Sequence, residues 1–97
     1  MDIEKRHLNI VRKILKQANS ASFYAFGSRA SNKAKPFSDL DICYRGEISR
    51  DLLLKMKSEF YESNLPYKVD LVAYSKLPEG FLQEIDQNMQ EIKLKAA

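Results

Sequence analysis

Two aspartates separated by one residue, Asp39 and Asp41, are the side chains of this 97-residue chain best suited to chemistry. They lie in the stretch Ser-Asp-Leu-Asp-Ile, which is typical of a β-strand. In a strand, residues i and i+2 point to the same face, about 6.5–7 Å apart along the backbone. Both carboxylates can therefore point to one place while Leu40 and Ile42 face a core.

A glycine-serine pair precedes the two aspartates. Gly27 and Ser28 end the apolar run at 23–26, and ten residues separate Ser28 from Asp39. Glycine lets the backbone approach a phosphate closely, backbone N–H groups at the start of a following helix would favour an anion, and the Ser28 hydroxyl adds a donor. Two acids beside such a turn predict a site for magnesium and a nucleoside triphosphate, with phosphoryl or nucleotidyl transfer as the chemistry.

A third carboxylate, Asp70, lies between Val69 and Leu71 in another strand-like segment. Buried acids are rare unless they are paired or bound to metal. We therefore predict that Asp70 completes the metal site, which would hold two magnesium ions about 3.5–4 Å apart, and that it takes up the proton of the attacking hydroxyl. The alternative is a half-buried acid paired with Lys68 or another base.

Several further residues lie near these motifs. Arg29 could contact phosphate or pair with an acid on the surface, and Ser38, directly before the aspartates, joins the predicted nucleotide-binding set. Cys43 shares the parity of Asp39 and Asp41, so it could line the edge of the site or simply fill the sheet face. His7 is the one histidine, which excludes a histidine metal cluster or a histidine-based triad.

The remaining sequence predicts a small α/β (α+β) domain over residues 1–97 that carries these motifs on a mixed sheet with helices packed on it. Apolar spacing predicts helices at 2–18 and 50–63, the second capped by Ser49, and a last helix that begins near Pro78. The strands are expected at 22–27, 39–44 and 67–74, and a short helix at 28–30. Phe81, Ile85, Met89 and Ile92 are expected to form the apolar stripe of the last helix.

Charge and composition limit the classes of partner and the cellular location to be expected. Net charge is +3, and the basic residues are dispersed, so direct nucleic-acid binding is not expected. No apolar run approaches the ~20 residues that cross a bilayer, the first residues lack the apolar core of a signal peptide, and a single cysteine cannot form an internal disulfide. The expected location is the cytoplasm.

The motifs Phe-Gly-Ser-Arg-Ala at 26–30, Asp-Leu-Asp at 39–41 and Val-Asp-Leu at 69–71 resemble the minimal nucleotidyltransferases of the DNA polymerase β superfamily. The resemblance implies a polymerase β palm-like fold, Gly27 and Ser28 as the triphosphate loop, and Asp39, Asp41 and Asp70 as the magnesium triad. It also implies a partner, a helical HEPN toxin that the protein silences as its antitoxin by moving AMP from ATP to a tyrosine. One departure is Asn32, where many relatives have glycine, and asparagine also tolerates left-handed backbone.

Two functions of different classes follow from these motifs. The first is a magnesium-dependent nucleotidyltransferase that uses ATP and a hydroxyl, expected to be a tyrosine, on a partner chain. The second is a binding antitoxin that neutralises its partner by forming a complex, with the nucleotide site idle or regulatory. An unused cluster of three acids would repel itself and cost stability, which favours the enzyme. Base preference, the number of AMP groups added and oligomeric state have no signal in the sequence.

Overall fold

The computed structural model describes residues 1–95, which form a four-stranded sheet with helices. The predicted small mixed sheet is confirmed, with one strand more than the three that the sequence predicts. The helices are α1 (Lys5–Leu15), α2 (Arg50–Glu62) and α3 (Glu79–Asn88), with single 3₁₀ turns at Lys16–Ala18 and Tyr74–Lys76. The strands are β1 (Ser22–Phe26), β2 (Leu40–Arg45), β3 (Val69–Ala73) and β4 (Gln90–Glu91).

The order of the strands in the sheet, β3-β2-β1-β4, brings the two acid-bearing strands side by side. Strand β1 pairs antiparallel with β2 and with β4, whereas β2 pairs parallel with β3. A parallel pair needs a long crossover, and α2 supplies it. In the resulting register Asp41 lies opposite Phe26 on one side and opposite Asp70 on the other.

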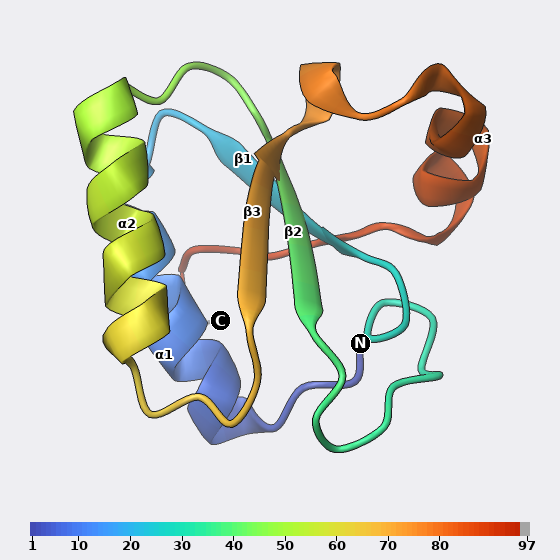
Figure 1. Ribbon diagram of the computed structural model, residues 1–97, viewed down its shortest axis with the longest axis horizontal. Helices are drawn as coiled ribbons and strands as arrows, with labels where there is room; N and C mark the ends of the chain where they lie inside the picture. Colours follow the sequence, from blue (N-terminus) through green and yellow to red (C-terminus); the bar gives the residue numbers. More distant parts are fainter. Residues whose placement is uncertain (96–97) are drawn as a thin grey trace.

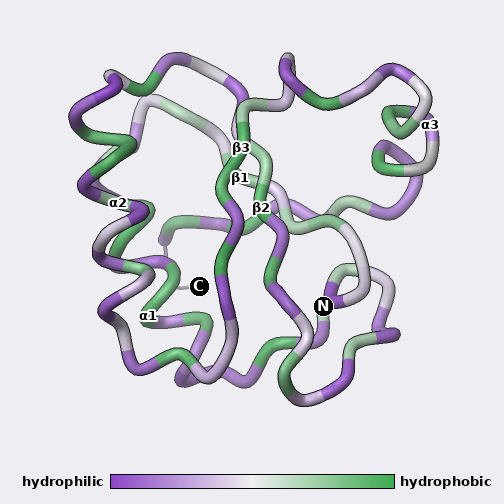
Figure 2. The backbone as a smooth tube through the Cα atoms, viewed as in Figure 1, coloured by the Kyte–Doolittle hydropathy of each residue, from purple (hydrophilic) through white to green (hydrophobic). Residues whose placement is uncertain are grey.

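Helices α1 and α2 cover one face of the sheet (Figure 1), and the hydrophobic core lies between these helices and the sheet. Alternation along the strands sends Phe23 and Ala25 of β1, with Leu40 and Ile42 of β2, into this core, where each is at most 1% exposed. The central strands and the inner sides of α1 and α2 are hydrophobic (Figure 2). Because Leu40 and Ile42 are buried here, Asp41 must point to the opposite face.

Helix α2 is the element that the sequence describes most closely. It begins after Ser49, whose hydroxyl oxygen accepts a hydrogen bond from the backbone N–H of Leu52 at 3.2 Å. Such a bond satisfies one of the free N–H groups of the first turn. The predicted cap is therefore confirmed. The spacing of Leu52, Leu53, Met56 and Phe60 also predicts that these four side chains face inward. Met56 and Phe60 are buried, and Leu52 and Leu53 pack partly buried against the same core.

Three local predictions are wrong. The first helix begins at Lys5 rather than at residue 2, because the backbone N–H of Asp2 donates to the Arg29 carbonyl at 2.7 Å and holds this segment away from the helix. Residues after Gly27 form successive turns instead of a short helix. Ile92 is buried in the core beyond β4, a strand that the sequence did not indicate, and so it is not part of the stripe of α3.

Helix α3 stands apart from the α1–α2 layer, beyond the other face of the sheet (Figure 1). The Tyr74 hydroxyl donates to the Asp86 carboxylate at 2.7 Å, and the Arg45 guanidinium lies 4.2 Å from the centre of the Tyr74 ring. These contacts tie α3 to the end of β3, while Phe81 remains 56% exposed.

Within residues 1–95, no helix has the length and apolar character that a membrane span requires.

Candidate active site

The three predicted acids lie at the start of β2 and β3, on the face opposite α1 and α2. Asp41 and Asp70 are direct partners across the parallel strand pair, and the Asp70 carboxyl lies within hydrogen-bonding reach of Asp41. Asp39 is exposed and lies one position before β2, whereas the predicted strand began at Asp39 itself. The fold therefore brings together two acids that are 29 positions apart, Asp41 and Asp70.

Gly27 closes the site on the β1 side. Its φ angle is +75°, in the left-handed region where side chains are disfavoured. A Cβ at this position would lie 2.6 Å from Oδ2 of Asp41, closer than two such atoms can approach. Both features require glycine here, and the glycine backbone lies directly against the Asp41 carboxylate. Its contact with phosphate stays a prediction.

The electrostatics of the site centre on Asp41. Burial, the charges of Asp70 and Asp39, and the hydrogen bond with Asp70, in that order, raise the pKa of the Asp41 carboxyl to about 6. Crowded carboxylates with raised pKa values are common at functional sites, because a cation or a proton is needed to offset the repulsion.

The donor set fits magnesium, which prefers hard oxygen ligands, commonly one or two carboxylates completed by substrate phosphates and water. Among the side chains that the structure describes, no three His, Cys, Asp or Glu residues are already arranged as a metal site. Carboxylates that repel each other do not converge fully without a cation, and phosphate oxygens would supply the ligands that the protein does not. The cross-strand pairing of Asp41 with Asp70, two carboxylates on neighbouring strands, favours a cation between these groups.

The segment after Gly27 is a compact turn. The Ser31 N–H donates to the Gly27 carbonyl at 3.2 Å and the Lys33 N–H to the Ser28 carbonyl at 2.8 Å, while the Ser31 hydroxyl also donates to the Gly27 carbonyl. Asn32 adopts a φ of 58°, so asparagine takes the left-handed position that glycine fills in many relatives, as expected. The residues directly after Gly27 form turns and not a helix. The predicted contribution of a helix N-terminus to phosphate binding is therefore wrong.

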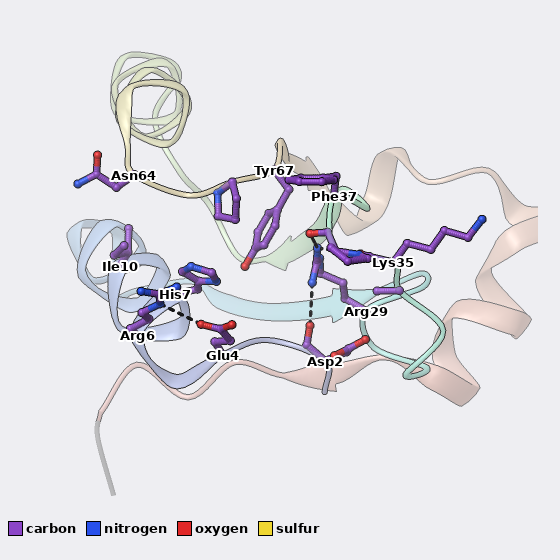
Figure 3. A pocket seen from close by; sticks show the side chains of 13 residues that line it. Asp2, Glu4, Arg6, His7, Ile10, Arg29, Lys35, Phe37, Asn64 and Tyr67 are labelled. Carbon is purple, nitrogen blue, oxygen red and sulfur yellow. Dashed lines mark hydrogen bonds and ion pairs between the residues drawn. The ribbon is translucent and has the colours of Figure 1, made fainter.

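Arg29 does not point to the acids. Its side chain is buried, with a residue exposure of 5%, and its guanidinium donates to the backbone carbonyls of Ser38 (2.9 Å), Asp2 (3.0 Å), Pro36 (3.1 Å) and Lys35 (3.4 Å). The guanidinium also stacks 3.8 Å from the centre of the Tyr67 ring (Figure 3). Contact with phosphate would break these bonds, and the described residues offer it no acid partner, so neither predicted role fits.

Two other residues near the predicted site, Ser38 and Cys43, have structural surroundings of their own. The Ser38 hydroxyl accepts a hydrogen bond from the Lys35 N–H at 2.9 Å, closing the turn that leads into Asp39. This bond gives Ser38 a place in the loop, and its contact with nucleotide stays a prediction. Cys43 is fully buried, which favours the packing interpretation over a place at the edge of the site, and burial raises the pKa of its thiol.

Two cavities lie near the predicted site, and one of them is lined by an acid. A cavity of about 420 Å³ beside β3 is lined by Asp70 together with Lys57, Tyr61 and Lys68. A second cavity, of about 610 Å³, lies where Arg29 and Tyr67 meet the start of α1, and its lining includes none of the three acids. Asp70 thus lines the first cavity, whereas the second is lined in part by residues of the loop before Asp39, among them Lys35 and Phe37.

Comparison with known families decides the class of the site. The family described as "Polymerase beta, Nucleotidyltransferase" matches residues 9–96, which is most of the chain. The chain belongs to the polymerase beta nucleotidyltransferase family. The resemblance drawn from the three motifs is thereby confirmed, as is the prediction of an enzyme of the nucleotidyltransferase class.

A curated relative narrows the comparison within the family. The chain is 40% identical over 88 residues to the protein named "Probable protein adenylyltransferase MntA" from Haemophilus influenzae, and the match covers 88% of this chain and 77% of the relative. The residues between Gly27 and Asp70 lie inside the range that the family matches.

Solved structures show the same fold at lower identity. A toxin–antitoxin structure with AMP-PNP superposes with a TM-score of 0.67 at 20% identity, covering 89% of this chain and 72% of that one. A mutant of the toxin–antitoxin MntA–HpeT gives 0.64 at 18% identity, covering 92% and 71%. A protein from Shewanella oneidensis gives 0.61 at 17% identity, covering 93% and 72%. These neighbours confirm the nucleotidyltransferase fold.

Proposed function

We propose that this protein is a magnesium-dependent adenylyltransferase that moves AMP from ATP to a hydroxyl of a partner toxin and acts as its antitoxin. The observation that supports it best is the convergence of Asp41, Asp70 and the Gly27 backbone in a chain that is 40% identical to a protein named as an MntA adenylyltransferase. The acceptor is expected to be a tyrosine of a helical HEPN protein, and the reaction to occur in the cytoplasm.

In this proposal Asp39, Asp41 and Asp70 would hold magnesium, and the bound ion would supply positive charge to offset that of the triphosphate. The Gly27 backbone allows close approach of the phosphates and the Ser28 hydroxyl donates a hydrogen bond to them. The acceptor oxygen forms a bond to the α-phosphorus as the bond to pyrophosphate breaks. Asp70 accepts the proton of the acceptor hydroxyl, and pyrophosphate carries away the displaced electron pair.

The position of Asp70 suits this role. It is exposed, it lies on the edge strand β3, and it lines the cavity beside Lys57 and Lys68. An acceptor side chain entering that cavity reaches a carboxylate without crossing the triphosphate loop at Gly27. In this proposal the partner presents the acceptor side chain to this cavity.

Intact mass spectrometry tests the proposal. The protein is incubated with its helical partner, magnesium and ATP, and the partner is weighed. Gain of one or more AMP units, absent with Asp39→Ala/Asp41→Ala, is the expected result. No gain with any of the four nucleotides, in a mixture that forms a stable complex, contradicts it.

A binding antitoxin is the second candidate, and the exposed apolar side of α3 is the observation that favours it. Such a protein would neutralise its partner by covering it. The same double variant separates the two candidates, because neutralisation survives the loss of both acids if binding is sufficient and is lost if transfer is required.

A further inference from the structure

We propose that Arg29 is a positioning residue of the active site, whose buried guanidinium fixes the loop that carries Asp39 and the segment that leads to Asp70 relative to the Gly27–Ser28 turn. This inference deepens the proposed function and rests on it. It replaces the predicted phosphate contact with a contact to backbone.

Arg29 connects four segments that are separated in the sequence. Covalently it belongs to the turn after Gly27, and its carbonyl accepts the N–H of Asp2, while its own guanidinium returns a bond to the Asp2 carbonyl. Its Nε donates to the carbonyl of Ser38, the residue directly before Asp39. The position of the Asp39 backbone is therefore set by a hydrogen bond one residue away.

The loop before Asp39 is held at two further points. Nη2 of Arg29 donates to the carbonyls of Pro36 and Lys35, so the guanidinium binds three carbonyls within four consecutive residues. Arginine suits this task because its planar fork presents five N–H donors in fixed directions, whereas lysine offers a single point of attachment.

The Arg29 guanidinium also contacts the segment that leads into β3. It stacks on the Tyr67 ring, three residues before Asp70, and His7 of α1 meets the same ring edge-on with the centres 5.7 Å apart. Figure 3 shows Arg29 and Tyr67 side by side above the Asp2 segment. A cation over an aromatic face is favourable, more so when it is desolvated, so the stack couples the lead-in to Asp70 with the loop before Asp39.

Burial makes this arrangement costly to abandon. A charged group removed from water is tolerated only when its donors are bonded. With an exposure of 5%, Arg29 meets that condition through the four carbonyls and one aromatic face given above. A buried cation that contacts the loops before β2 and β3, with no acid as its partner among the described residues, is explained by a role in placing those loops.

The test compares Arg29→Met and Arg29→Lys with wild type in the transfer assay, and with Arg12→Met as the matched control. Arg12 also donates its Nε to a backbone carbonyl, that of Lys93 at 2.8 Å, but far from the acids. Displacement of catalytic groups by about 1 Å costs roughly 100-fold in rate. We expect kcat to fall about 10- to 100-fold in both Arg29 variants with KM for ATP little changed, and neither to change in Arg12→Met.

The Lys variant separates positioning from phosphate contact. If Arg29 bound phosphate, lysine would retain much of the activity and methionine would act mainly on KM for ATP, and either result overturns the proposal. Unchanged kcat in folded Arg29 variants that are merely less stable would also overturn it, because it would leave only a structural role.

A second measurement does not depend on transfer. Binding of Mn²⁺ in the presence of a nonhydrolysable ATP analogue is measured by calorimetry, and both Arg29 variants should bind the metal about ten-fold more weakly, in keeping with the effect of groups that orient metal ligands. If wild type binds Mn²⁺ but transfers nothing, the proposed function fails while this inference is still decided by the metal affinities. If wild type does not bind Mn²⁺, or the variants bind it equally well, the inference fails.

The Tyr67 pair keeps the proposal testable if the Arg29 variants do not fold. Tyr67→Leu removes the stacked ring, whereas Tyr67→Phe keeps it and removes only a buried hydroxyl that has no hydrogen-bond partner within residues 1–95. We expect Mn²⁺ affinity and kcat to fall in Tyr67→Leu and to match wild type in Tyr67→Phe. Equal behaviour of the two variants would contradict the coupling through the stack.

Discussion

At the scale of single residues, the groups around Asp41 destabilise the ionised form of its carboxyl. Its carboxyl has a pKa of about 6 in the fold against 3.8 ordinarily, because burial and two neighbouring acids disfavour its charge. The folded state therefore holds the proton more tightly than the unfolded state. Ionisation costs stability as pH rises from about 4 to 6, and the full cost is present at neutral pH.

Asp41→Asn should therefore stabilise the metal-free protein. After allowance for solvent screening, the gain in unfolding free energy is about 1–2 kcal/mol at pH 7.5 and close to zero below pH 4. Urea denaturation with a chelator present, at both pH values, measures it, and Glu47→Gln in the exposed turn after β2 is the control. The same variant should show no transfer. Equal gains at the two pH values would refute the electrostatic origin.

Gly27→Ala tests the close approach at the turn. The added Cβ meets Asp41 Oδ2 at 2.6 Å and the backbone holds a φ of +75°, so we expect a loss of about 1–3 kcal/mol in stability and loss of transfer. Gly80→Ala is the matched control, because nothing lies within 4 Å of a Cβ there and alanine favours α3 by about 0.5–1 kcal/mol. A Gly27→Ala variant as stable as wild type would show that the turn has another conformation.

The sequence predicts the acids better than the arginine, for a physical reason. Strand parity alone places Asp41 opposite the buried Leu40 and Ile42, and the structure agrees. For Arg29 the residue type indicates only an anionic or carbonyl partner. Which of these it meets depends on the path of the loop at 33–38, which local sequence does not determine.

At the scale of elements, long periodic segments were predictable and short or tertiary ones were not. The cap of α2 and the inward residues Met56 and Phe60 follow from local pattern. Strand β4 has only two residues and exists because it pairs with Tyr24 and Ala25 of β1. Such a segment has no periodicity of its own, and the late start of α1 likewise depends on the distant Arg29 carbonyl.

Helix α3 carries a prediction of its own, since its apolar residues remain partly exposed on the catalytic side of the sheet (Figures 1 and 2). Phe81→Ser should change the unfolding free energy by less than about 0.5 kcal/mol, as is usual for surface substitutions. If this side contacts the toxin, the same change should weaken the complex about ten-fold or more, as loss of a buried aromatic anchor does.

The control for Phe81 is Leu54→Ser on α2, an apolar side chain that is 54% exposed and lies outside the cavity beside Asp70. Titration calorimetry with the partner and urea denaturation of the free protein measure both quantities. Equal affinities for wild type and Phe81→Ser would place the interface elsewhere, whereas a large loss of stability in Phe81→Ser would show that α3 packs on its own sheet.

At the scale of the whole molecule, stability and ligand binding are coupled through the acids. The metal-free fold carries three neighbouring carboxylates at one edge of a small sheet, and their repulsion opposes folding. A ligand that binds only the folded state adds RT ln(1 + [L]/Kd) to the unfolding free energy, about 2.7 kcal/mol at a hundred times Kd. For a domain of this size, each kcal/mol raises Tm by roughly 4–8 °C.

Magnesium together with a nonhydrolysable ATP analogue should therefore raise Tm by about 10 °C or more at saturation, whereas the analogue with a chelator should raise it much less. In Asp39→Asn/Asp41→Asn the response to magnesium should disappear even though the ligand-free Tm rises, because the substitution removes both the repulsion and the metal ligands. That opposite pair of shifts distinguishes a metal–nucleotide site from general stabilisation by polyphosphate. If the Tm of the double variant rose as much as that of wild type, the nucleotide would bind away from these acids. The cluster of carboxylates would then have no function in nucleotide binding.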